Sequence, residues 1–539
     1  MAKRDYLLFI LLALAGAFAI TRGLVVAPGF TDAFYHFNAA NQLVTGKGFT
    51  DHYLWTYIGA PDSLPTPSHL YWLPLTSVAA AFGMGILNAP GNFAAAQWPF
   101  TLMLAGTGCV GFWLGARLGQ TRRHAWLAGI LTLMGGFFMR FWGTTDTFAP
   151  FALVGSLCLV CMGLALERGH VATRSYRWWV LTGALAGLGH LTRADGVLLL
   201  FAAWAVILWP FYDLISQRVH HDAPLQQTRF SLTQRVIALL IVTAAYGLVM
   251  LPWFMRNLNS VGSLLPVGGA QGIWFAEYDD LFNYPPDASP QTLFADGPGA
   301  FLQSRWEAFT GNLGTLVAVE GMVVLAPLML IALWKRRAQP FMRGFWLYAL
   351  GLHLAMTLIF PFPGLRGGLF HSAAALFPFW MALGVVGLDD VIDWIAQRRR
   401  HWNRLTAKRI FSAALLIFCV ALSLSISVPR RFRAGTPPLY TALLETLPEG
   451  ARVMINDPAQ LFYYTGFGGV VLPNETPDVL PEIARKYGVD YLVLESQVVN
   501  GQTVLAASNQ LASILTAPPD FLSEIEIDVP GVRLYEIHS

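Results

Sequence analysis

The chain has 539 residues, of which 55% are hydrophobic and only 12% are charged. Soluble domains carry about 25% charged residues, so this composition excludes an ordinary soluble globular protein. The formal net charge of +3 decides little, because in a membrane chain the positions of the charges matter more than their sum.

The hydrophobic residues occur in blocks that are long enough to cross a bilayer, which takes about 20 residues per helix. The first block follows Lys3 and Arg4, and apolar sequence continues through Val26. We therefore expect a retained first helix there and not a cleaved signal peptide. In all, we predict about eleven transmembrane helices. They are expected at residues 6–26, 98–116, 124–142, 147–166, 178–192, 196–213, 236–255, 316–334, 344–361, 369–388 and 410–428.

One further apolar stretch, residues 70–87, decides the topology. It contains Pro74 and begins with a Tyr-Trp pair, which suits a helix that rests on the membrane surface. If it does not cross, the short segments that hold most of the lysine and arginine residues all face the cytoplasm, as the positive-inside rule requires. We therefore predict a multi-pass protein of the cytoplasmic membrane of the cell, with its N-terminus inside and its C-terminus outside.

This topology leaves three large segments outside the membrane. Residues 1–428 form the predicted transmembrane domain, which includes a first external loop at 27–97 and a second large one at 257–313. Residues 429–539 are more charged, and their apolar runs shorten to strand length. Strands are expected within 451–457, 469–473 and 490–496, and helices within 437–448 and 478–488. The predicted fold class is thus an all-α polytopic membrane protein with a small extracytoplasmic α/β domain.

Acidic residues at the external ends of the predicted spans are the first candidates for chemistry, because charge at a membrane edge is costly without a role. Asp32 lies a few residues beyond the first span, and Asp146 lies just before the fourth. A structural role is the alternative, since Thr31 or Asp32 could cap a surface helix and Thr145 or Asp146 could cap the fourth span. The topology places both acids on the same side of the membrane.

Basic residues accompany them at this face. Arg193 and Asp195 share a tight turn between two spans, Arg256 ends the seventh, and His371 opens the tenth. Arg193 and Asp195 could form an ion pair, and Arg256 could extend its side chain to the lipid headgroups.

Carboxylates and arginines at one membrane face suit an amphiphilic substrate with a phosphate at headgroup level. Arginine binds phosphate through charge-assisted hydrogen bonds, and a carboxylate can remove a proton from an attacking hydroxyl or amine. Displacement at an anomeric carbon would then expel a polyprenyl phosphate and invert the stereochemistry. The sequence has no nucleotide-binding glycine loop and no dedicated metal-ligand cluster, so we expect neither a cofactor nor a metal.

The order of these parts resembles the GT-C membrane glycosyltransferases, specifically the bacterial relatives of protein O-mannosyltransferases and lipid A aminoarabinose transferases (glycosyltransferase family 39-like). The segments that carry the resemblance are DAFYHFNAANQLVTGKGFTD, PSHLYWLPLTS, GTTDTFAPFALVG, LTRADG, LPWFMRNLNSVGSLLP, HSAAALFPF and NDPAQLFYYTGFGGVVLPN. The resemblance implies that Asp32 is the catalytic acid of the first loop and that Asp146 helps to form the site. It also implies that Arg256, and less closely Arg193, binds the phosphate of the carrier.

The chain departs from the family in two places. Ala33 follows Asp32 where many relatives have a second acid, and Phe370, His371 and Ser372 replace a late Arg-Tyr-Pro pattern. Both departures leave the sugar and the acceptor open, and the acceptor is a protein, a lipid or a glycan. Further candidates for the substrate site are Tyr35, His36, His69, Glu277, Tyr278 and His371.

The resemblance thus implies an inverting glycosyltransferase of the hexosyl- or pentosyltransferase class that uses a polyprenyl-phosphate sugar at the outer face of the membrane. The alternative is a transporter or flippase of a lipid-linked glycan. Transporters, however, place charged residues at the middle of the bilayer, whereas the candidates here gather at one edge. A membrane scaffold without activity would not explain acids at both Asp32 and Asp146. We expect no nucleic-acid partner.

Overall fold

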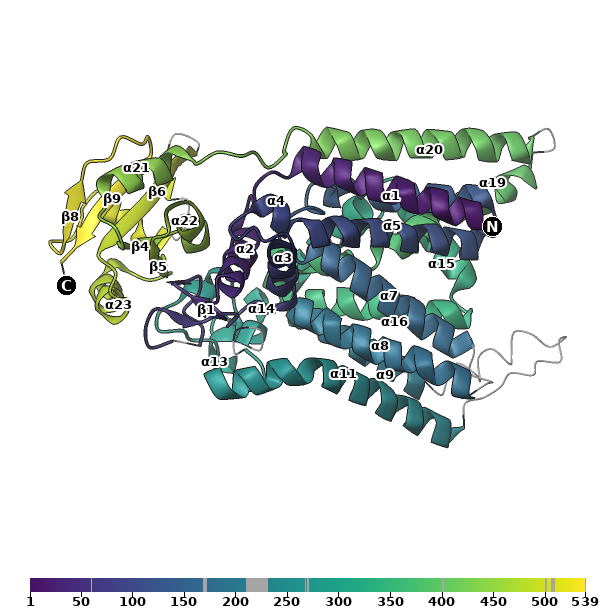
Figure 1. The fold of residues 1–539 in the computed structure, drawn as a ribbon, viewed down its shortest axis with the longest axis horizontal. Helices are drawn as coiled ribbons and strands as arrows, with labels where there is room; N and C mark the ends of the chain where they lie inside the picture. The colour runs from purple at the N-terminus through teal and green to yellow at the C-terminus, as the bar shows by residue number, and fades with distance from the viewer. Residues whose placement is uncertain are drawn as a thin grey trace.

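The computed structural model describes residues 1–59, 61–167, 172–209, 231–266, 268, 271–399, 402–499, 502–505 and 509–538. It consists of a bundle of long, roughly parallel helices and a separate domain that contains a β-sheet, joined by an extended segment (Figure 1). The N-terminus lies at the end of the bundle farthest from the sheet (Figure 1). Shorter helices and loops lie between the bundle and the sheet.

The helices of the bundle carry most of the apolar sequence. They are α1 (Lys3–Leu24), α5 (Trp98–Gly119), α6 (Arg122–Met134), α7 (Phe148–Glu167), α8 (Ala172–Thr192), α9 (Val197–Leu208), α11 (Leu232–Val261), α14 (Gly297–Thr315), α15 (Ala326–Arg336), α16 (Pro340–Leu354), α18 (Leu369–Ala373), α19 (Phe377–Ala396) and α20 (Arg404–Ser427).

Six helices in the described part of the chain are long and apolar enough to cross a membrane, or seven if one bent pair is counted as a single span. The six are Lys3–Leu24, Phe93–Gly119, Phe148–Glu167, Leu232–Val261, Pro340–Ile359 and Arg404–Ser427, and each contains most or all of a span predicted from the sequence. The bent pair, Pro361–Ala373 and Phe377–Ala396, turns by 70° and covers the span predicted at 369–388. The span predicted at 178–192 falls on α8, which has 21 residues but is not among the six, and the remaining predicted spans fall on shorter or interrupted helices. The structure therefore does not establish the number eleven.

Local backbone geometry explains the shortened spans. Helix α6 ends at Gly135, whose left-handed φ of 69° stops the helix before residue 142, where the sequence predicted its end. The span predicted at 316–334 is broken, because Met322 and Val323 both have positive φ angles of 43° and 64°. Just before this break, buried Glu320 accepts a hydrogen bond from the Trp380 indole at 2.6 Å, which satisfies one of its oxygens.

The loops that the sequence predicts to be external carry the short elements that position the site. They are α2 (Thr31–Val44), β1 (Thr50–Asp51), β2 (Tyr53–Leu54), β3 (Thr66–Pro67), α3 (Leu75–Ile86), α4 (Phe93–Ala96), α13 (Pro290–Leu293) and α17 (Pro361–Pro363). The surface helix considered at Asp32 is present as α2, but its residues 33–40 are all buried, so it is packed within the protein. Helix α3 has 12 residues, fewer than the roughly 20 needed to cross a bilayer, as expected for a helix that does not span.

The tail forms the sheet domain and confirms the predicted strands and helices. Its strands are β4 (Arg452–Ile455), β5 (Gly468–Val471), β6 (Tyr491–Val499), β7 (Gln502–Leu505), β8 (Leu522–Ile525) and β9 (Val532–Ile537), and its helices are α21 (Pro438–Thr446), α22 (Pro458–Thr465) and α23 (Leu480–Tyr487). The strand order is β2-β5-β4-β6-β9-β8, and β7 pairs with β6. The pairs β2–β5, β5–β4 and β4–β6 are parallel, whereas β6–β9 and β9–β8 are antiparallel.

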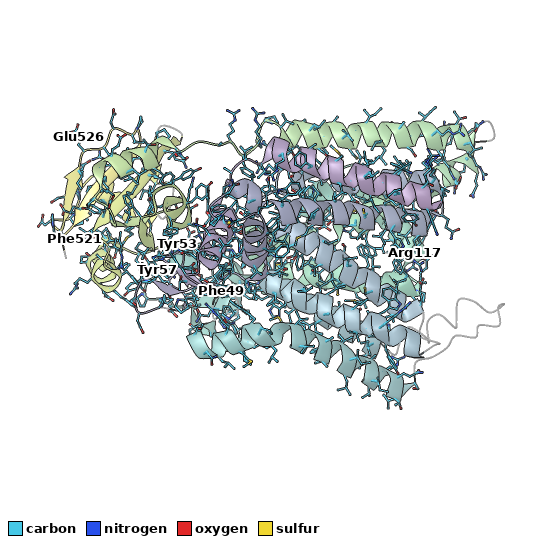
Figure 2. The ribbon with its side chains drawn as sticks, in the orientation of Figure 1. Phe49, Tyr53, Tyr57, Arg117, Phe521 and Glu526 are labelled. Atoms are coloured by element: carbon cyan, nitrogen blue, oxygen red, sulfur yellow. The ribbon has the colours of Figure 1, made fainter. Side chains whose placement is uncertain are left out.

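One strand of this sheet comes from the first external loop. Tyr53 in β2 lies opposite Gly469 in β5, and the two strands run parallel. The Tyr57 hydroxyl also donates a hydrogen bond to the carbonyl of Val471 at 2.5 Å. Figure 2 shows Tyr53 and Tyr57 between the bundle and the sheet, and Arg117 at the opposite end of the bundle. The first loop is therefore an integral part of the sheet domain.

Candidate active site

Helix α2 places Asp32 at its N-terminal end. The helix is capped by Phe30, which offers no side-chain hydrogen bond, and Thr31 and Asp32 are its first two residues. The capping role considered for Thr31 or Asp32 is therefore wrong, because both residues already have helical geometry. The Asp32 carboxylate, with 29% of its side chain exposed, is left free to face the site.

Asp146 lies in the turn before α7 and is fully buried at its side chain. One oxygen, Oδ1, accepts a hydrogen bond from the backbone N–H of Thr147. The preceding Thr145 hydroxyl donates to the carbonyl of Ala33 at 2.7 Å. This bond fastens the turn to α2 beside Asp32, so the two predicted acids meet although they are far apart in sequence.

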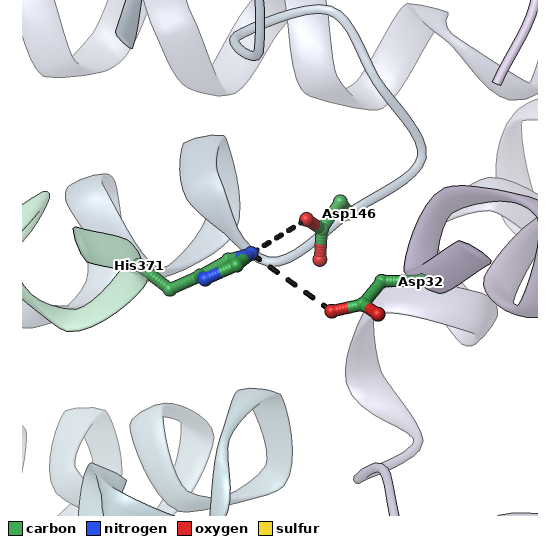
Figure 3. A group of neighbouring side chains, drawn as sticks. All are labelled: Asp32, Asp146 and His371. Carbon is green, nitrogen blue, oxygen red and sulfur yellow. Dashed lines mark hydrogen bonds and ion pairs between the residues drawn. The ribbon is translucent and has the colours of Figure 1, made fainter. Parts of the chain in front are cut away.

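His371, from α18, points its Nε2 toward both carboxylates (Figure 3). Its Nε2 is 2.9 Å from Asp146 Oδ2 and 3.9 Å from Asp32 Oδ2. The ring stacks on Phe148, with centroids 4.0 Å apart. Its Nδ1 is 2.8 Å from the carbonyl oxygen of Gly367, which can only accept, so Nδ1 carries a proton.

That hydrogen bond constrains the charge of the site. In a neutral ring with its proton on Nδ1, Nε2 would present a lone pair to the Asp146 carboxylate. Two acceptors 2.9 Å apart repel unless a proton or a cation lies between them. The geometry therefore calls for a proton between His371 Nε2 and Asp146 Oδ2 or for a bound cation.

The two acids have different proton affinities. Burial, and after it the charge of Asp146, raises the pKa of Asp32 to about 6. Burial acts on Asp146 in the same direction, but the charge and hydrogen bond of His371 outweigh it and lower its pKa below the ordinary value. Asp146 is thus held ionised, and Asp32 is the acid whose proton is exchanged near neutral pH.

The same three residues are of the types that bind divalent metals. Asp32, Asp146 and His371 each offer one ligand atom, and these atoms all lie within 4.8 Å of one another. Two carboxylates and one imidazole suit several divalent ions. The sequence did not reveal this cluster, because its third member lies far along the chain from the two acids.

Arg193 is bound by protein groups on several sides. It forms the ion pair with Asp195 that the sequence left open, at 3.0 Å. It also donates to the Ser372 hydroxyl at 2.8 Å, to the Thr147 hydroxyl at 3.2 Å and to the Gly368 carbonyl at 3.3 Å. These bonds connect the turns that carry Asp146 and His371.

Arg256 binds the first external loop. Its guanidinium donates to the carbonyls of Ser68 at 2.9 Å and Phe49 at 3.3 Å, and it lies 4.8 Å from the ring centroid of Trp253. It therefore links α11 to the loop that carries Asp32, and it does not simply extend to the headgroups. Its binding to a donor phosphate stays a prediction.

Three of the candidate substrate residues form a buried cluster behind the carboxylates. The Tyr35 hydroxyl donates to Asp51 at 2.8 Å and accepts from the backbone N–H of His69 at 2.6 Å. His36 and His69 both contact the Ser77 hydroxyl, at 2.8 and 2.9 Å. Burial lowers the pKa of His36 to about 4 and raises that of Asp51 to about 7. These hydrogen bonds to other protein groups give Tyr35, His36 and His69 a structural role that supports the site.

The second external loop supplies the other two candidates. Glu277 is exposed, and its backbone N–H is bound by Asp280 at 3.0 Å. Tyr278 lies nearer the centre of the site, where the charge of Asp32 acts on it. Burial, and after it this charge, raises the pKa of Tyr278 to about 12. Two residues that the sequence analysis did not single out also reach the site. Trp72 forms a hydrogen bond that acts to lower the pKa of Asp32, and Arg366 lies over Tyr278 at 4.8 Å.

Comparison with known proteins identifies the fold. No protein-family model and no curated protein matches the chain. The oligosaccharyltransferase of Archaeoglobus fulgidus in the apo form matches with a TM-score of 0.59 and 14% identity, over 91% of this chain and 70% of that one. Its complex with Zn and sulfate matches with a TM-score of 0.58 and 14% identity, over 90% and 67%. ArnT from Cupriavidus metallidurans bound to undecaprenyl phosphate matches with a TM-score of 0.53 and 13% identity, over 99% and 98%.

These matches show that the chain has the fold that the Archaeoglobus oligosaccharyltransferase and ArnT share. The fold expected from the resemblance in the sequence is thereby confirmed. Together with its long apolar helices, this fold makes the chain a multi-pass membrane protein.

Proposed function

We propose that the protein is an inverting glycosyltransferase that moves a sugar from a polyprenyl-phosphate donor to an acceptor at the outer face of the cytoplasmic membrane. The observation that carries the proposal is the meeting of Asp32, Asp146 and His371 on a GT-C fold. ArnT from Cupriavidus metallidurans, which covers the same length, is described bound to undecaprenyl phosphate. The fold and the two acids, Asp32 and Asp146, thus both favour a polyprenyl-phosphate sugar as the donor.

In the proposed reaction Asp32 is the general base. It takes the proton from an acceptor hydroxyl or amine, and the acceptor atom forms a bond to the anomeric carbon from the face opposite the phosphate. The bond between the anomeric carbon and the phosphate oxygen breaks, and the polyprenyl phosphate leaves with its electron pair. Asp146 holds the His371 imidazolium next to Asp32, and the positive charge favours the ionised form of Asp32.

We propose about eleven transmembrane helices, with the N-terminus inside and the sheet domain outside. The N-terminus and the sheet lie at opposite ends of the bundle (Figure 1), which supports their placement on opposite sides of the membrane, and the positive-inside rule supplies the direction. Asp32 lies on an external loop that joins the sheet, so the proposed site opens on the outer side.

The proposed reaction needs no metal. The Archaeoglobus oligosaccharyltransferase is described in complex with Zn, and a divalent cation would here be held by Asp32, Asp146 and His371. Such an ion would supply charge to stabilise the leaving phosphate. A second proton on His371 satisfies the same contact between Nε2 and Asp146, and it requires nothing that the chain does not contain.

The experiment is turnover of a radiolabelled polyprenyl-phosphate sugar by purified Asp32→Asn protein. The amide keeps the size of the side chain but cannot accept a proton, and loss of a general base costs about 10²–10⁴-fold in rate. Asp62→Asn, in an exposed part of the same loop, is the matched control, and thermal unfolding of each variant checks the fold. Wild-type turnover by well-folded Asp32→Asn would end the proposal. Movement of the carrier across liposomes without its consumption would establish a transporter in its place.

A further inference from the structure

A shallow pocket lies at the end of the bundle that carries the N-terminus (Figure 1). It has a volume of about 480 Å³ and is lined by Arg122, Arg123 and Trp126, all near the start of α6. Asp146 follows the other end of this helix, so the pocket is separate from the candidate active site. No step of the proposed reaction uses the three residues.

The two arginines connect the pocket to a helix on each side. Helices α1 and α20 both pack against α6. Arg122 Nε is 2.8 Å from Asp5 Oδ1, in the first turn of α1. Arg123 donates to the carbonyl of Lys408 at 3.2 Å and to the Ser412 hydroxyl, both in α20. The pocket therefore lies on α6, and α1 and α20 form its two walls.

Arg122 keeps hydrogen-bond donors for a ligand. Its side chain is 67% exposed, and Asp5 is its one ion-pair partner in the described part of the chain. That pair uses Nε, and the two terminal nitrogens of the guanidinium make no hydrogen bond to the described residues. Two such nitrogens can bind two oxygens of one phosphate group.

The pocket is surrounded by an excess of positive charge. Four further cations at the same ends of the walls are exposed and form no ion pair with the described residues: Lys3 and Arg4 in α1, and Arg404 and Arg409 in α20. Asp5 and Asp389, the acids that contact the pocket arginines, are both already paired. A ligand with a net negative charge is therefore favoured here.

Beyond their charged ends, the walls of the pocket are exposed apolar surfaces. Only 33% of the apolar stretch of α1 and 28% of that of α20 are buried within the protein. Leu8 and Leu12 in α1 are exposed, as are Ile410 and Phe411 in α20. In a membrane protein such surfaces face acyl chains, so the arginines at the helix ends lie at the level of the lipid headgroups.

We propose that this pocket binds the headgroup of an anionic phospholipid, with the acyl chains along α1 and α20. The Arg122 guanidinium binds the phosphate, and Trp126 forms an apolar floor beside it. A zwitterionic lipid carries a positive group of its own, which the surrounding cations repel. In the proposed orientation this lipid belongs to the cytoplasmic leaflet. The inference depends on the chain being a membrane protein and not on the proposed transfer of a sugar.

The test is titration of the purified full-length protein in a neutral detergent with phosphatidylglycerol, followed by native mass spectrometry. Arg122→Ala is expected to weaken binding about tenfold or more, and Arg122→Lys should retain part of the affinity because it keeps the charge but lacks the planar fork. Asp5→Asn breaks the same ion pair but leaves the guanidinium free, so it should bind the lipid at least as tightly as the wild type. Equal losses in Arg122→Ala and Asp5→Asn would show a structural role for the pair and overturn the proposal.

A matched control and two competing ligands complete the experiment. Arg337→Ala should bind like the wild type, because Arg337 is also exposed and lies 3.6 Å from the Trp334 ring centroid but does not line the pocket. Phosphatidylcholine should bind much more weakly than phosphatidylglycerol, and equal binding would refute selection for a negative charge. Inorganic phosphate should not compete, and competition at equal affinity would show a site for the free ion and refute the lipid assignment. Thermal unfolding of each variant checks the fold.

Discussion

The hydroxyl of Thr31 donates a hydrogen bond of 2.7 Å to Asp457 Oδ2, across 426 positions of sequence. Thr31 immediately precedes Asp32, and Asp457 caps α22 by accepting from the backbone N–H of Gln460. The carbonyl of Ala459 also accepts from Asn38 at 2.8 Å. The sheet domain therefore holds the helix that carries the proposed base, so its contribution is tested first.

The Thr31→Val substitution should lower turnover, although valine and threonine have side chains of nearly the same shape. The substitution leaves the partly buried Asp457 oxygen without its donor, which costs at most about 1–3 kcal/mol of stability. Turnover is expected to fall about tenfold, since a displacement of about 1 Å can cost about 10²-fold in rate. Thr31→Ser keeps the hydroxyl and should behave as wild type, as should Thr441→Val on the exposed face of α21. Equal turnover in Thr31→Val and Thr31→Ser would remove the sheet domain from the catalytic argument.

The pH dependence follows from the pKa of Asp32. Burial, and next the charge of Asp146, raises it to about 6, and a general base must be ionised to act. The fraction of ionised Asp32 falls as the pH falls through this value. We therefore expect kcat/KM to be constant above about pH 7 and to drop about tenfold per unit below about pH 5.5. The check is a profile of kcat/KM against pH, measured with enzyme that recovers its activity after incubation at each pH. A rate that rises with falling pH would argue against Asp32 as the base.

Arg256 should affect both donor affinity and the first loop. Arg256→Ala removes the bonds to the Ser68 and Phe49 carbonyls, so weaker donor binding and a lower unfolding temperature are expected. Lys should rescue only in part, because it lacks the planar fork. Arg433→Ala, at an exposed external position, is the control. Full donor affinity in a destabilised Arg256→Ala would leave this arginine a structural role alone.

Removal of metal should leave turnover unchanged. The proposed mechanism balances charge with a proton on His371, so prolonged treatment with a chelator is expected to have no effect on kcat. Metal analysis of the purified protein and add-back of Mg²⁺, Mn²⁺ or Zn²⁺ complete the measurement. Loss of activity that one of these ions restores would instead place a cation between Asp32, Asp146 and His371, where the ligand atoms are within 4.8 Å.

The orientation can be read with a reporter that is active only outside the cytoplasm. Fused after residue 539 it should be active, and inserted at Arg122 it should be silent. Arg122 begins α6 and forms an ion pair with Asp5 near the N-terminus at 2.8 Å, so both residues should face the cytoplasm. Activity at Arg122 would mean that residues 70–87 cross the membrane.

Much of this arrangement could be predicted from local patterns. Long apolar blocks predicted the six span-length helices, and short apolar runs predicted β4, β5 and β6, because hydrophobic period and length are properties of neighbouring residues. The positive-inside rule placed Asp32 and Asp146 on one face, and the structure brings their ligand atoms together. The interruption after Glu320 was not predicted, because an apolar composition does not reveal a change in backbone φ.

Local sequence patterns could not predict which groups the site residues contact. The position of His371 next to the two acids depends on the kink at Gly367. The hydrogen bonds of the arginines go to backbone carbonyls, which every residue has, so the sequence does not reveal which carbonyl accepts them. Strand β2 has only two residues and pairs with a strand from the tail, so no periodicity marks it.

The parallel pairing of β2 with β5 has a consequence for biosynthesis. Residues 53–54 leave the ribosome long before residues 468–471, and every membrane helix except α1 is made in between. Helix α2 and Asp32 therefore emerge among the first residues of the protein but reach their final packing only after the last domain has been made and folded. A nascent or truncated chain can insert into the bilayer, yet its proposed base stays out of position until synthesis is complete.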